Sequence, residues 1–232
     1  MSETSIKMSE SSIKVKSKAF LFDLDGTLVD SAPDLTESLA ITFNQLGLKP
    51  PSHEKVKSWI GNGVDKLLHR ALTNSVDGIA SDDPFWSARK LFFDAYQKQS
   101  GKLSKLYTGV REILEYLQKK KVPIACITNK NRAFTLPLLQ MLGIDIYFEV
   151  VVCGDDLSNK KPHPEPLNYA AKKLGVENQF CVMVGDSVND IKAAQAANMD
   201  MICVDYGYNQ GQDLSLYNVK AILSNLNNVQ VY

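Results

Sequence analysis

The sequence FLFDLDGTLVD, residues 20–30, joins a strand-like apolar run to two carboxylates and a glycine. Its apolar residues predict a buried strand that ends at Asp23 and Asp25. Side chains two residues apart in an extended chain point the same way, so we expect the two carboxylates to converge. Carboxylates this close repel each other unless a cation or a proton lies between them. The alternative interpretation is an ordinary Asp-Gly turn that closes the strand.

Four further apolar runs predict strands, and none of them alternates with polar residues. They are VPIACIT at 122–128, FEVVVCG at 148–154, FCVMVGD at 180–186 and MICVDYG at 201–207. Continuous apolar strands are typical of a parallel sheet covered on both faces. Helices expected at about 108–121, 131–142, 164–174 and 188–197 supply the crossovers, with Thr108 capping the first and Pro137 kinking or restarting the second. The sequence therefore predicts an α/β fold with a Rossmann-like parallel sheet.

The long segment between the first two expected strands contains no convincing strand. It predicts helices from Ser31 to about Leu46, over 64–72, and after Pro84. We therefore expect an all-α cap domain at 31–106, inserted into a core of residues 18–30 and 107–232. An insertion at the carboxyl end of the first strand lies over the edge where open parallel sheets bind ligands. Residues 1–17 contain the polar near-repeat MSETSIK and MSESSIK, and we expect a disordered tail there.

Composition excludes several classes of protein. The chain has 232 residues, with 26 Lys and Arg balancing 26 Asp and Glu, so no global field favours nucleic acid or an anionic membrane. The longest apolar runs are too short to span a bilayer, and no signal-peptide pattern is present, so we expect a cytoplasmic protein, monomeric or homodimeric. Four cysteines without a C-x-x-C pair predict buried, reduced thiols.

Polar side chains follow two more of the expected strands. Thr128 and Asn129 end the second strand, and GDSVND places Asp186 and Asp190 at the end of the fourth. Acids gathered at one sheet edge need positive charge, and an all-oxygen cluster favours Mg²⁺. The pair Lys160 and Lys161 in NKKPHPEPL can supply a lysine, aimed inward if the neighbouring prolines hold the backbone extended. The alternatives are helix caps at the strand ends and solvated lysines, Lys130 included.

These motifs occur in the order and spacing of one known family. The sequence resembles the haloacid dehalogenase superfamily of phosphotransferases, and WIGNG, TNK, GDDLSNKKPHPEPL, GDSVNDI and YGYN are similar to the bacterial phosphoglycolate phosphatases within it. The resemblance extends over the whole chain beyond the tail. Asn131 departs from the pattern, because relatives often have proline after TNK, but it touches only a loop.

The resemblance implies a role for each core residue. Asp23 is the nucleophile that forms a phosphoaspartate, and Asp25 is the general acid and base. Mg²⁺ is held by the Asp23 carboxylate, the Asp25 backbone carbonyl and Asp186. Further roles implied by family position are phosphate binding by the Thr128 hydroxyl and the Asn129 backbone N–H, a link from Lys161 to the phosphate and Asp23, and support by Asp190 from behind the metal ligands.

The inserted segment is expected to supply specificity because it faces the leaving group. Free N–H groups in the loop at Asn62 and Gly63, or charge from Lys66 or Arg70, could contact an anionic leaving group, although an ordinary tight turn explains the loop equally well. The implied reaction is Mg²⁺-dependent hydrolysis of a small phosphate ester, with 2-phosphoglycolate first. The alternatives are a sugar phosphomutase, a phosphatase for another small ester, and a non-catalytic phosphate-binding protein. Dehalogenation is disfavoured because a halide needs no protonation by Asp25.

Overall fold

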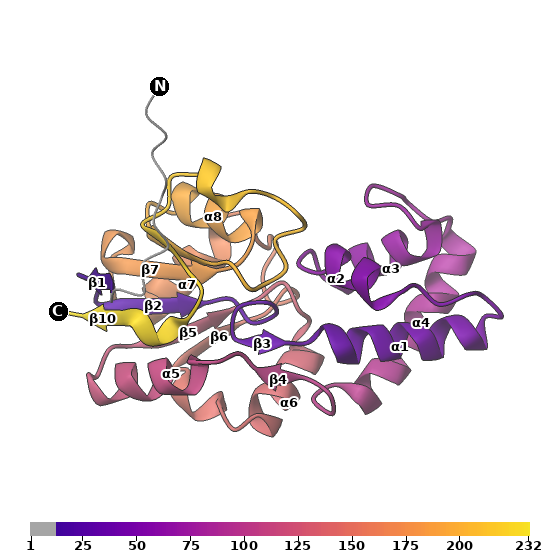
Figure 1. Cartoon of the computed structure of the whole chain (residues 1–232), viewed down its shortest axis with the longest axis horizontal. Helices are drawn as coiled ribbons and strands as arrows, with labels where there is room; N and C mark the ends of the chain where they lie inside the picture. The colour runs from indigo at the N-terminus through magenta and orange to yellow at the C-terminus, as the bar shows by residue number, and fades with distance from the viewer. Residues whose placement is uncertain (1–12) are drawn as a thin grey trace.

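The computed structural model describes residues 13–232 and contains a central six-stranded parallel sheet (Figure 1). Its strand order is β6-β5-β2-β7-β8-β9. The chain therefore winds outward from β2 in one direction, returns, and winds outward in the other, as in doubly wound nucleotide-binding folds. The strands are β2 (Ala19–Phe22), β5 (Ile124–Ile127), β6 (Val150–Val152), β7 (Cys181–Gly185), β8 (Asp200–Val204) and β9 (Ala221–Leu223). The predicted α/β fold class is confirmed, and so are the five expected strands.

The side chains of β2 explain why its sequence is apolar throughout. Phe20 and Phe22 pack on one face of the sheet with α5 and α6, whereas Ala19 and Leu21 pack on the other face with α7 and α8. Both faces of the strand are therefore buried, as the continuous apolar pattern predicted. The four covering helices are α5 (Val110–Lys119), α6 (Arg132–Met141), α7 (Glu165–Leu174) and α8 (Val188–Ala196).

Four further helices form a separate layer beyond the carboxyl edge of the sheet, at the right of Figure 1. We call them the cap; they are α1 (Ala32–Gln45), α2 (His53–Trp59), α3 (Val64–Thr73) and α4 (Asp82–Gln99). The two connections pair as antiparallel strands, β3 (Val29–Asp30) and β4 (Lys105–Leu106). The apolar core of the cap includes Phe134 of α6 and Tyr208 of the loop after β8, so the cap packs against the sheet domain. The helix α2 was not expected from the sequence.

The expected disordered tail at 1–17 is wrong for its last residues. Ile13–Val15 forms β1, which pairs in parallel with β10 (Val229–Val231), and Val15 is fully buried. The rest of the expected tail, residues 1–12, lies outside the described residues. The short 3-10 turns are η1 (Asp145–Tyr147), η2 (Asn178–Phe180), η3 (Leu214–Leu216) and η4 (Leu226–Asn228).

Some helix ends differ from the expectation. Ser31 does precede α1, but its hydroxyl donates to the Asp25 carboxylate at 2.6 Å instead of capping the helix. The helix α5 starts after Gly109, in the left-handed region, and not with a Thr108 cap. Pro137 lies inside an uninterrupted α6. These differences leave the order of the elements unchanged.

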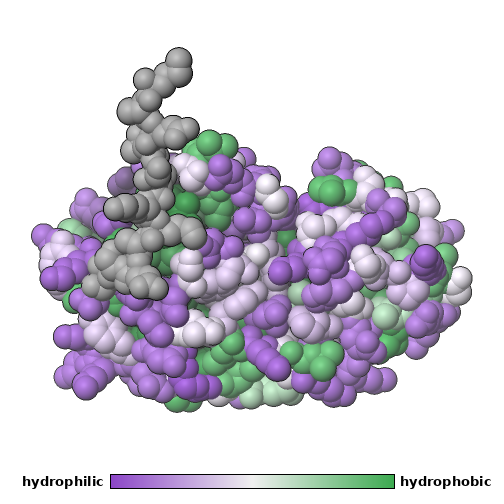
Figure 2. Space-filling model, in the orientation of Figure 1, coloured by the Kyte–Doolittle hydropathy of each residue, from purple (hydrophilic) through white to green (hydrophobic). Residues whose placement is uncertain are grey.

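The surface in Figure 2 is polar over most of the visible face, with apolar side chains in separate patches. Within residues 13–232, no helix has the length and apolar character that crossing a bilayer requires. All four cysteines are buried free thiols, as predicted.

The cap is joined to its return connection by a buried carboxylate. Asp34, in the first turn of α1, is fully buried and accepts hydrogen bonds from the backbone N–H groups of Gly101, Leu103 and Ser104 at 2.7, 2.9 and 3.1 Å. The Ser104 hydroxyl donates to the same carboxylate. Four donors replace the water that an ionised carboxylate loses on burial, so the start of α1 is tied to the chain leaving α4.

We expect Asp34→Ala to lower the free energy of unfolding by about 2–4 kcal/mol, because buried backbone donors lose their charged acceptor. Urea denaturation measures the change. The matched control is Asp65→Ala, which removes an exposed ion pair to Arg89 and should cost less than about 1 kcal/mol. Equal losses in the two variants would contradict the role of Asp34.

Candidate active site

The carboxyl ends of three neighbouring strands bring the predicted polar residues together. Asp23 follows β2, Thr128 follows β5 and Asp186 follows β7, and β2 lies between the other two strands. Backbone pairing continues past the ends, since the Asp23 N–H donates to the Val184 carbonyl and the Thr128 N–H to the Val152 carbonyl, both at 2.9 Å. The sheet itself therefore fixes the positions of these residues.

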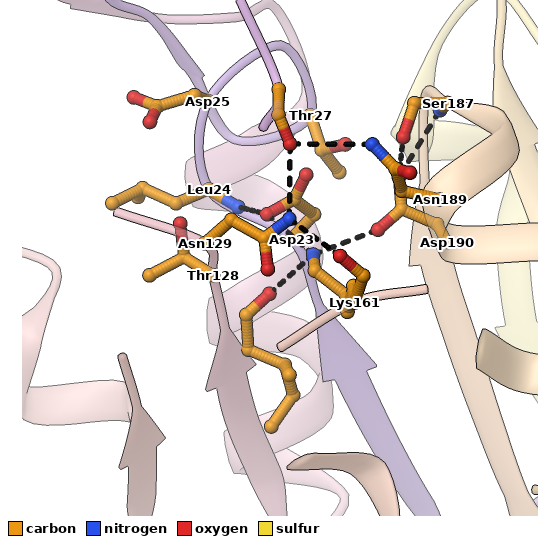
Figure 3. A network of polar contacts seen from close by, with 12 residues as sticks. Asp23, Leu24, Asp25, Thr27, Thr128, Asn129, Lys161, Ser187, Asn189 and Asp190 are labelled. Atoms are coloured by element: carbon orange, nitrogen blue, oxygen red, sulfur yellow. Dashed lines mark hydrogen bonds and ion pairs between the residues drawn. The ribbon is translucent and has the colours of Figure 1, made fainter. Parts of the chain in front are cut away.

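Lys161 lies at the centre of the site, and all of its N–H donors are used. Its Nζ is 2.7 Å from an Asp23 oxygen and 2.7 Å from an Asp190 oxygen, and it donates to the Ile127 carbonyl at 2.6 Å (Figure 3). An ammonium with three acceptors has no freedom left to rotate. The side chain points inward as expected, but through a turn with a cis Lys161–Pro162 bond and not through extended backbone. Lys160 is exposed.

Asp190 is fixed on the side away from Asp23. One of its oxygens accepts from the N–H and hydroxyl of Ser187, at 3.1 and 2.6 Å, and this contact forms the capping box of α8. The other oxygen binds Lys161. Asp190 is fully buried, so these donors are needed to offset its desolvation. Asp190 therefore lies on the far side of Lys161 from Asp23, and its supporting role stays a prediction.

The site carries more buried negative than positive charge. Oxygens of Asp23, Asp186 and Asp190 lie within 4.8 Å of one another. Burial, and then the neighbouring acids, raise the pKa of Asp23 although Lys161 opposes the shift. Burial and Asp190 raise the pKa of Asp186 to about 7. Three carboxylates face one ammonium, so the donor set fits a divalent cation bound by oxygen ligands.

Asp186 is also oriented by two residues that are distant from it in sequence. The Thr27 hydroxyl donates to one of its oxygens at 2.7 Å and the Tyr208 N–H to the other at 2.6 Å. The close approach requires glycine at position 26, where φ is +91° and an added Cβ would lie 2.2 Å from an Asp186 oxygen. The Gly-Thr that follows Asp25 in the sequence therefore holds this acid in place.

Contrary to the expectation, the Asp25 carboxylate does not converge with that of Asp23. Its carboxylate binds Lys130 Nζ at 2.8 and 2.9 Å and accepts from Ser31, and Figure 3 shows it turned away from Asp23. The expectation assumed an extended chain, but β2 ends at Phe22 and the backbone turns before Gly26. The alternation of side chains along a strand therefore stops before Asp25.

The alternative interpretation made Lys130 a solvated lysine, and the structure buries it instead. The residue is 4% exposed, and its ammonium lies 5.0 Å from the centre of the Tyr96 ring of the cap. Burial alone would lower the pKa of Lys130, but the contacts with Asp25 and Tyr96 together outweigh burial and raise it. Its place directly after Thr128 and Asn129 was the signal that could have assigned it to the site.

A cavity of about 30 Å³ lies between the cap and the sheet edge. The core residues that line it are Asp23, Asp25, Thr128, Asn129 and Lys130. The cap residues are Leu35, Ile60, Gly61, Gly63, Val64 and Leu67. The cap side of the cavity is therefore apolar apart from the backbone of the glycine loop.

Three of the predicted contacts from the cap are not found at this cavity. The Arg70 guanidinium donates to the Trp59 and Val76 carbonyls at 2.7 and 2.8 Å, so it stabilises the interior of the cap and the expectation that it binds ligand is wrong. Asn62 faces the core loop after β8, where its side-chain oxygen accepts from Gln210 at 3.3 Å. Lys66 does not line the cavity either.

The loop at residues 60–63 is held against the core by three side-chain amides. The sequence analysis did not predict these contacts. Asn129 and Asn189 donate to the Gly61 carbonyl at 3.0 and 3.3 Å, and Gln210 donates to the Ile60 carbonyl at 2.7 Å. The amides come from three separate core segments, namely the loop after β5, the first turn of α8 and the loop after β8, so no local sequence pattern shows that they meet. They hold the cap closed over the cavity.

The backbone that carries Thr128 and Asn129 is buttressed by Gly154 in the loop after β6. The Gly154 N–H donates to the Lys130 carbonyl at 2.9 Å, and an added Cβ would lie 2.2 Å from the Asn129 carbonyl oxygen. Only glycine fits this approach without moving the chain. GDD in the sequence therefore supports the end of β5.

The fold and site define a class of protein, an α/β enzyme with a helical cap over an acidic centre that contains a lysine. Residues 20–204 match the sequence profile of the haloacid dehalogenase-like hydrolases. The chain belongs to this family, and the resemblance noted in the sequence is confirmed.

Several proteins similar to this chain are named phosphoglycolate phosphatases. The chain is 44% identical to a phosphoglycolate phosphatase of Nitrosococcus oceani, over 88% of this chain and 95% of that protein. It is 39% identical to the phosphoglycolate phosphatase of Escherichia coli K12, over 90% and 89%. A crystal structure of a predicted phosphoglycolate phosphatase from Haemophilus somnus superposes with a TM-score of 0.86 at 34% identity, covering 92% of this chain and 96% of that one.

We expect Gly154→Ala to displace the backbone of residues 128–130, because the new methyl group has no space beside the Asn129 carbonyl. Amide resonances of these residues in ¹H–¹⁵N spectra should shift. The control is Gly175→Ala, where an added Cβ has no neighbour within 4 Å. Unmoved resonances in Gly154→Ala would contradict the buttress.

Proposed function

We propose that this protein is a Mg²⁺-dependent phosphomonoesterase that acts through a phosphoaspartate on Asp23, with 2-phosphoglycolate as its substrate. The observation that carries the proposal is the Asp23 carboxylate, held by Lys161 beside two further buried acids at the floor of a closed cavity. The names of relatives 39–44% identical to this chain support the choice of substrate. Residues 18–30 and 107–232 act as the catalytic core in this proposal, and residues 31–106 act as its cap.

The donor set supports a magnesium site. Asp23 and Asp186 would hold the ion with the Asp25 backbone carbonyl, and Asp190 would stay on Lys161, where its contacts already place it. Mg²⁺ prefers oxygen ligands and keeps several waters, which suits a site with few protein donors. When bound, the ion neutralises the nucleophile and a phosphate oxygen so that two anions can approach each other.

Asp23 is prepared for in-line attack by fixed donors. One of its oxygens accepts from the Leu24 N–H at 2.8 Å and lies 2.7 Å from Lys161 Nζ. The carboxylate therefore has one orientation, which lowers the entropy cost of reaching the transition state. The Asp23 oxygen forms a bond to phosphorus while the ester oxygen leaves with the bonding electrons, and water later cleaves the acyl phosphate.

Thr128 and Asn129 offer donors to the phosphate oxygens. The Thr128 oxygen accepts from the Lys130 N–H at 3.1 Å, so its own hydrogen is available to a ligand. The backbone N–H of Asn129 has no acceptor within residues 13–232. Donors already in position need no reorganisation when charge develops on the phosphoryl oxygens. Lys161 adds a positive charge on the same side.

Asp25 suits the role of general acid and base for the leaving group. It lines the cavity, 13% of its side chain is exposed, and it lies on the side that faces the cap. A carboxyl group here gives its proton to the departing alkoxide and then takes a proton from the attacking water. Its present partners, Lys130 and Ser31, lie outside the phosphate-binding group formed by Thr128, Asn129 and Lys161.

The closed cavity favours a small leaving group over a sugar. On the cap side it is bounded by Leu35, Val64 and Leu67, whose apolar side chains offer no hydrogen-bond partners to the hydroxyl groups of a hexose. Glycolate has only a carboxylate and one further carbon besides the ester oxygen. The sugar phosphomutase alternative is therefore the weaker proposal.

We expect the purified protein to release phosphate from 2-phosphoglycolate only when Mg²⁺ is present, and to form no isomer from a hexose phosphate. Asp23→Asn should lower kcat/KM by at least about a thousandfold, because the amide cannot attack phosphorus. The matched control, Asp200→Asn, lies at the opposite end of the sheet and should retain activity. Substantial turnover by Asp23→Asn would refute the nucleophile assignment.

We expect Mg²⁺ to raise the unfolding temperature of the wild-type protein, by about 5–10 °C at roughly a hundred times its Kd. The reason is the unbalanced negative charge of the buried acids. In Asp186→Asn the shift should be much smaller, and EDTA should reverse the wild-type shift. Differential scanning fluorimetry measures both, and an equal shift in the two proteins would contradict the metal site.

A further inference from the structure

The cavity contains one ammonium that the phosphate chemistry does not use. Lys161 binds Asp23 and Asp190 at the floor, whereas Lys130 lies at the wall, bound to Asp25. Lys130 is the only basic residue among those that line the cavity within residues 13–232. Asp25 compensates the buried charge of Lys130, so the question is what the lysine contributes at the cavity wall.

Lys130 has donor capacity to spare. Two of its three N–H groups are directed to the two Asp25 oxygens, at 2.8 and 2.9 Å, and no other acceptor for it occurs in the described part of the chain. The Tyr96 hydroxyl is also buried without a hydrogen-bond partner there, in the helix α4 above the same ammonium. The third N–H of Lys130 is therefore available to an acceptor from outside the chain.

Apart from the backbone of the glycine loop, the cap side of the cavity offers an anion no polar group. Leu35, Ile60, Val64 and Leu67 are apolar, so a negative charge on the leaving group would be desolvated against them without compensation. Lys130 faces the same cavity as Asp25, the residue proposed to protonate the leaving oxygen. The ammonium is therefore placed for the part of the substrate that lies one or two bonds beyond that oxygen.

We propose that Lys130 is the specificity-determining residue that binds a carboxylate on the leaving group, so that the enzyme selects small phosphate esters with a second negative charge. This inference rests on the proposed phosphatase function and adds the feature that separates its substrate from neutral esters. The Asp25 contact need not break, because the third N–H of Lys130 is free to donate to the new carboxylate.

The test compares three substrates in the full-length protein with Mg²⁺. The first is 2-phosphoglycolate, and the second is 2-hydroxyethyl phosphate, which replaces the carboxylate with a neutral group of similar size. The third is p-nitrophenyl phosphate, whose leaving group needs no protonation. In Lys130→Gln, kcat/KM for 2-phosphoglycolate should fall about 10- to 100-fold, mainly through KM, since a charge-assisted contact is lost. The value for 2-hydroxyethyl phosphate should change less than about threefold.

The matched control is Lys66→Gln, which removes a cap lysine that does not line the cavity and should leave all three values unchanged. A parallel fall for both alkyl esters, with p-nitrophenyl phosphate unaffected, would show that Lys130 only positions Asp25 and would overturn the proposal. An equal fall for all three substrates would overturn it too. If the wild-type protein hydrolyses none of them, the proposed phosphatase function itself fails.

Lys130→Gln leaves the buried Asp25 carboxylate unpaired, which can prevent folding. A binding measurement in a second background avoids this problem. In the background Asp25→Asn the carboxylate is absent, so loss of the lysine creates no buried charge. Calorimetry should show that adding Lys130→Gln weakens 2-phosphoglycolate binding about 10- to 100-fold and leaves 2-hydroxyethyl phosphate binding within about threefold. Equal weakening of both ligands would overturn the proposal.

Discussion

The rest of the site depends on one buried ammonium, that of Lys161. Its Nζ bridges Asp23 from β2 and Asp190 from α8, and donates to the carbonyl that ends β5. Without this cation, carboxylates brought to one sheet edge would repel each other in a medium that screens charge poorly. The interaction therefore lets three separate segments of the chain meet at the same place, and it still leaves negative charge for a divalent ion to neutralise.

Parallel-sheet geometry explains why so much of this centre could be predicted from sequence. The apolar strands end at Asp23, Thr128 and Asp186, and strands that run in parallel bring those ends to one edge whatever their order in the sheet. Because the strands are buried on both faces, their sequences are continuous apolar runs, and these runs predicted them. The paired strands β1 and β10 were not predicted. Each has only three residues, and β1 lies in a polar segment, so the sequence has too little pattern to indicate them.

The residues that could not be predicted act through contacts between segments distant in sequence. Asp25 was expected to face Asp23, but the chain leaves the extended conformation after Phe22, and the side chain meets Lys130 of a loop about a hundred residues later. Arg70 looked like a ligand for anions, and it is used inside the cap to satisfy backbone carbonyls. Charge type alone does not tell a ligand contact from a structural one; the burial and the partners of the side chain do.

The two buried lysines, Lys161 and Lys130, have separate partners and act on different parts of the site. Lys161 has all of its donors engaged within the chain, so it is rigid and can orient a nucleophile, but has little left to discriminate among ligands. Lys130 keeps a donor free next to apolar cap residues, where a contact is worth more because water is excluded. Since Asn129 donates both to the cap loop and to the Lys161 carbonyl, closure of the cap is coupled to the floor of the site. The cap can therefore exclude water and enclose the leaving group next to Lys130 of the core in a single closed arrangement, so that substrate choice depends both on the cap and on a core residue beside the strand ends that do the chemistry.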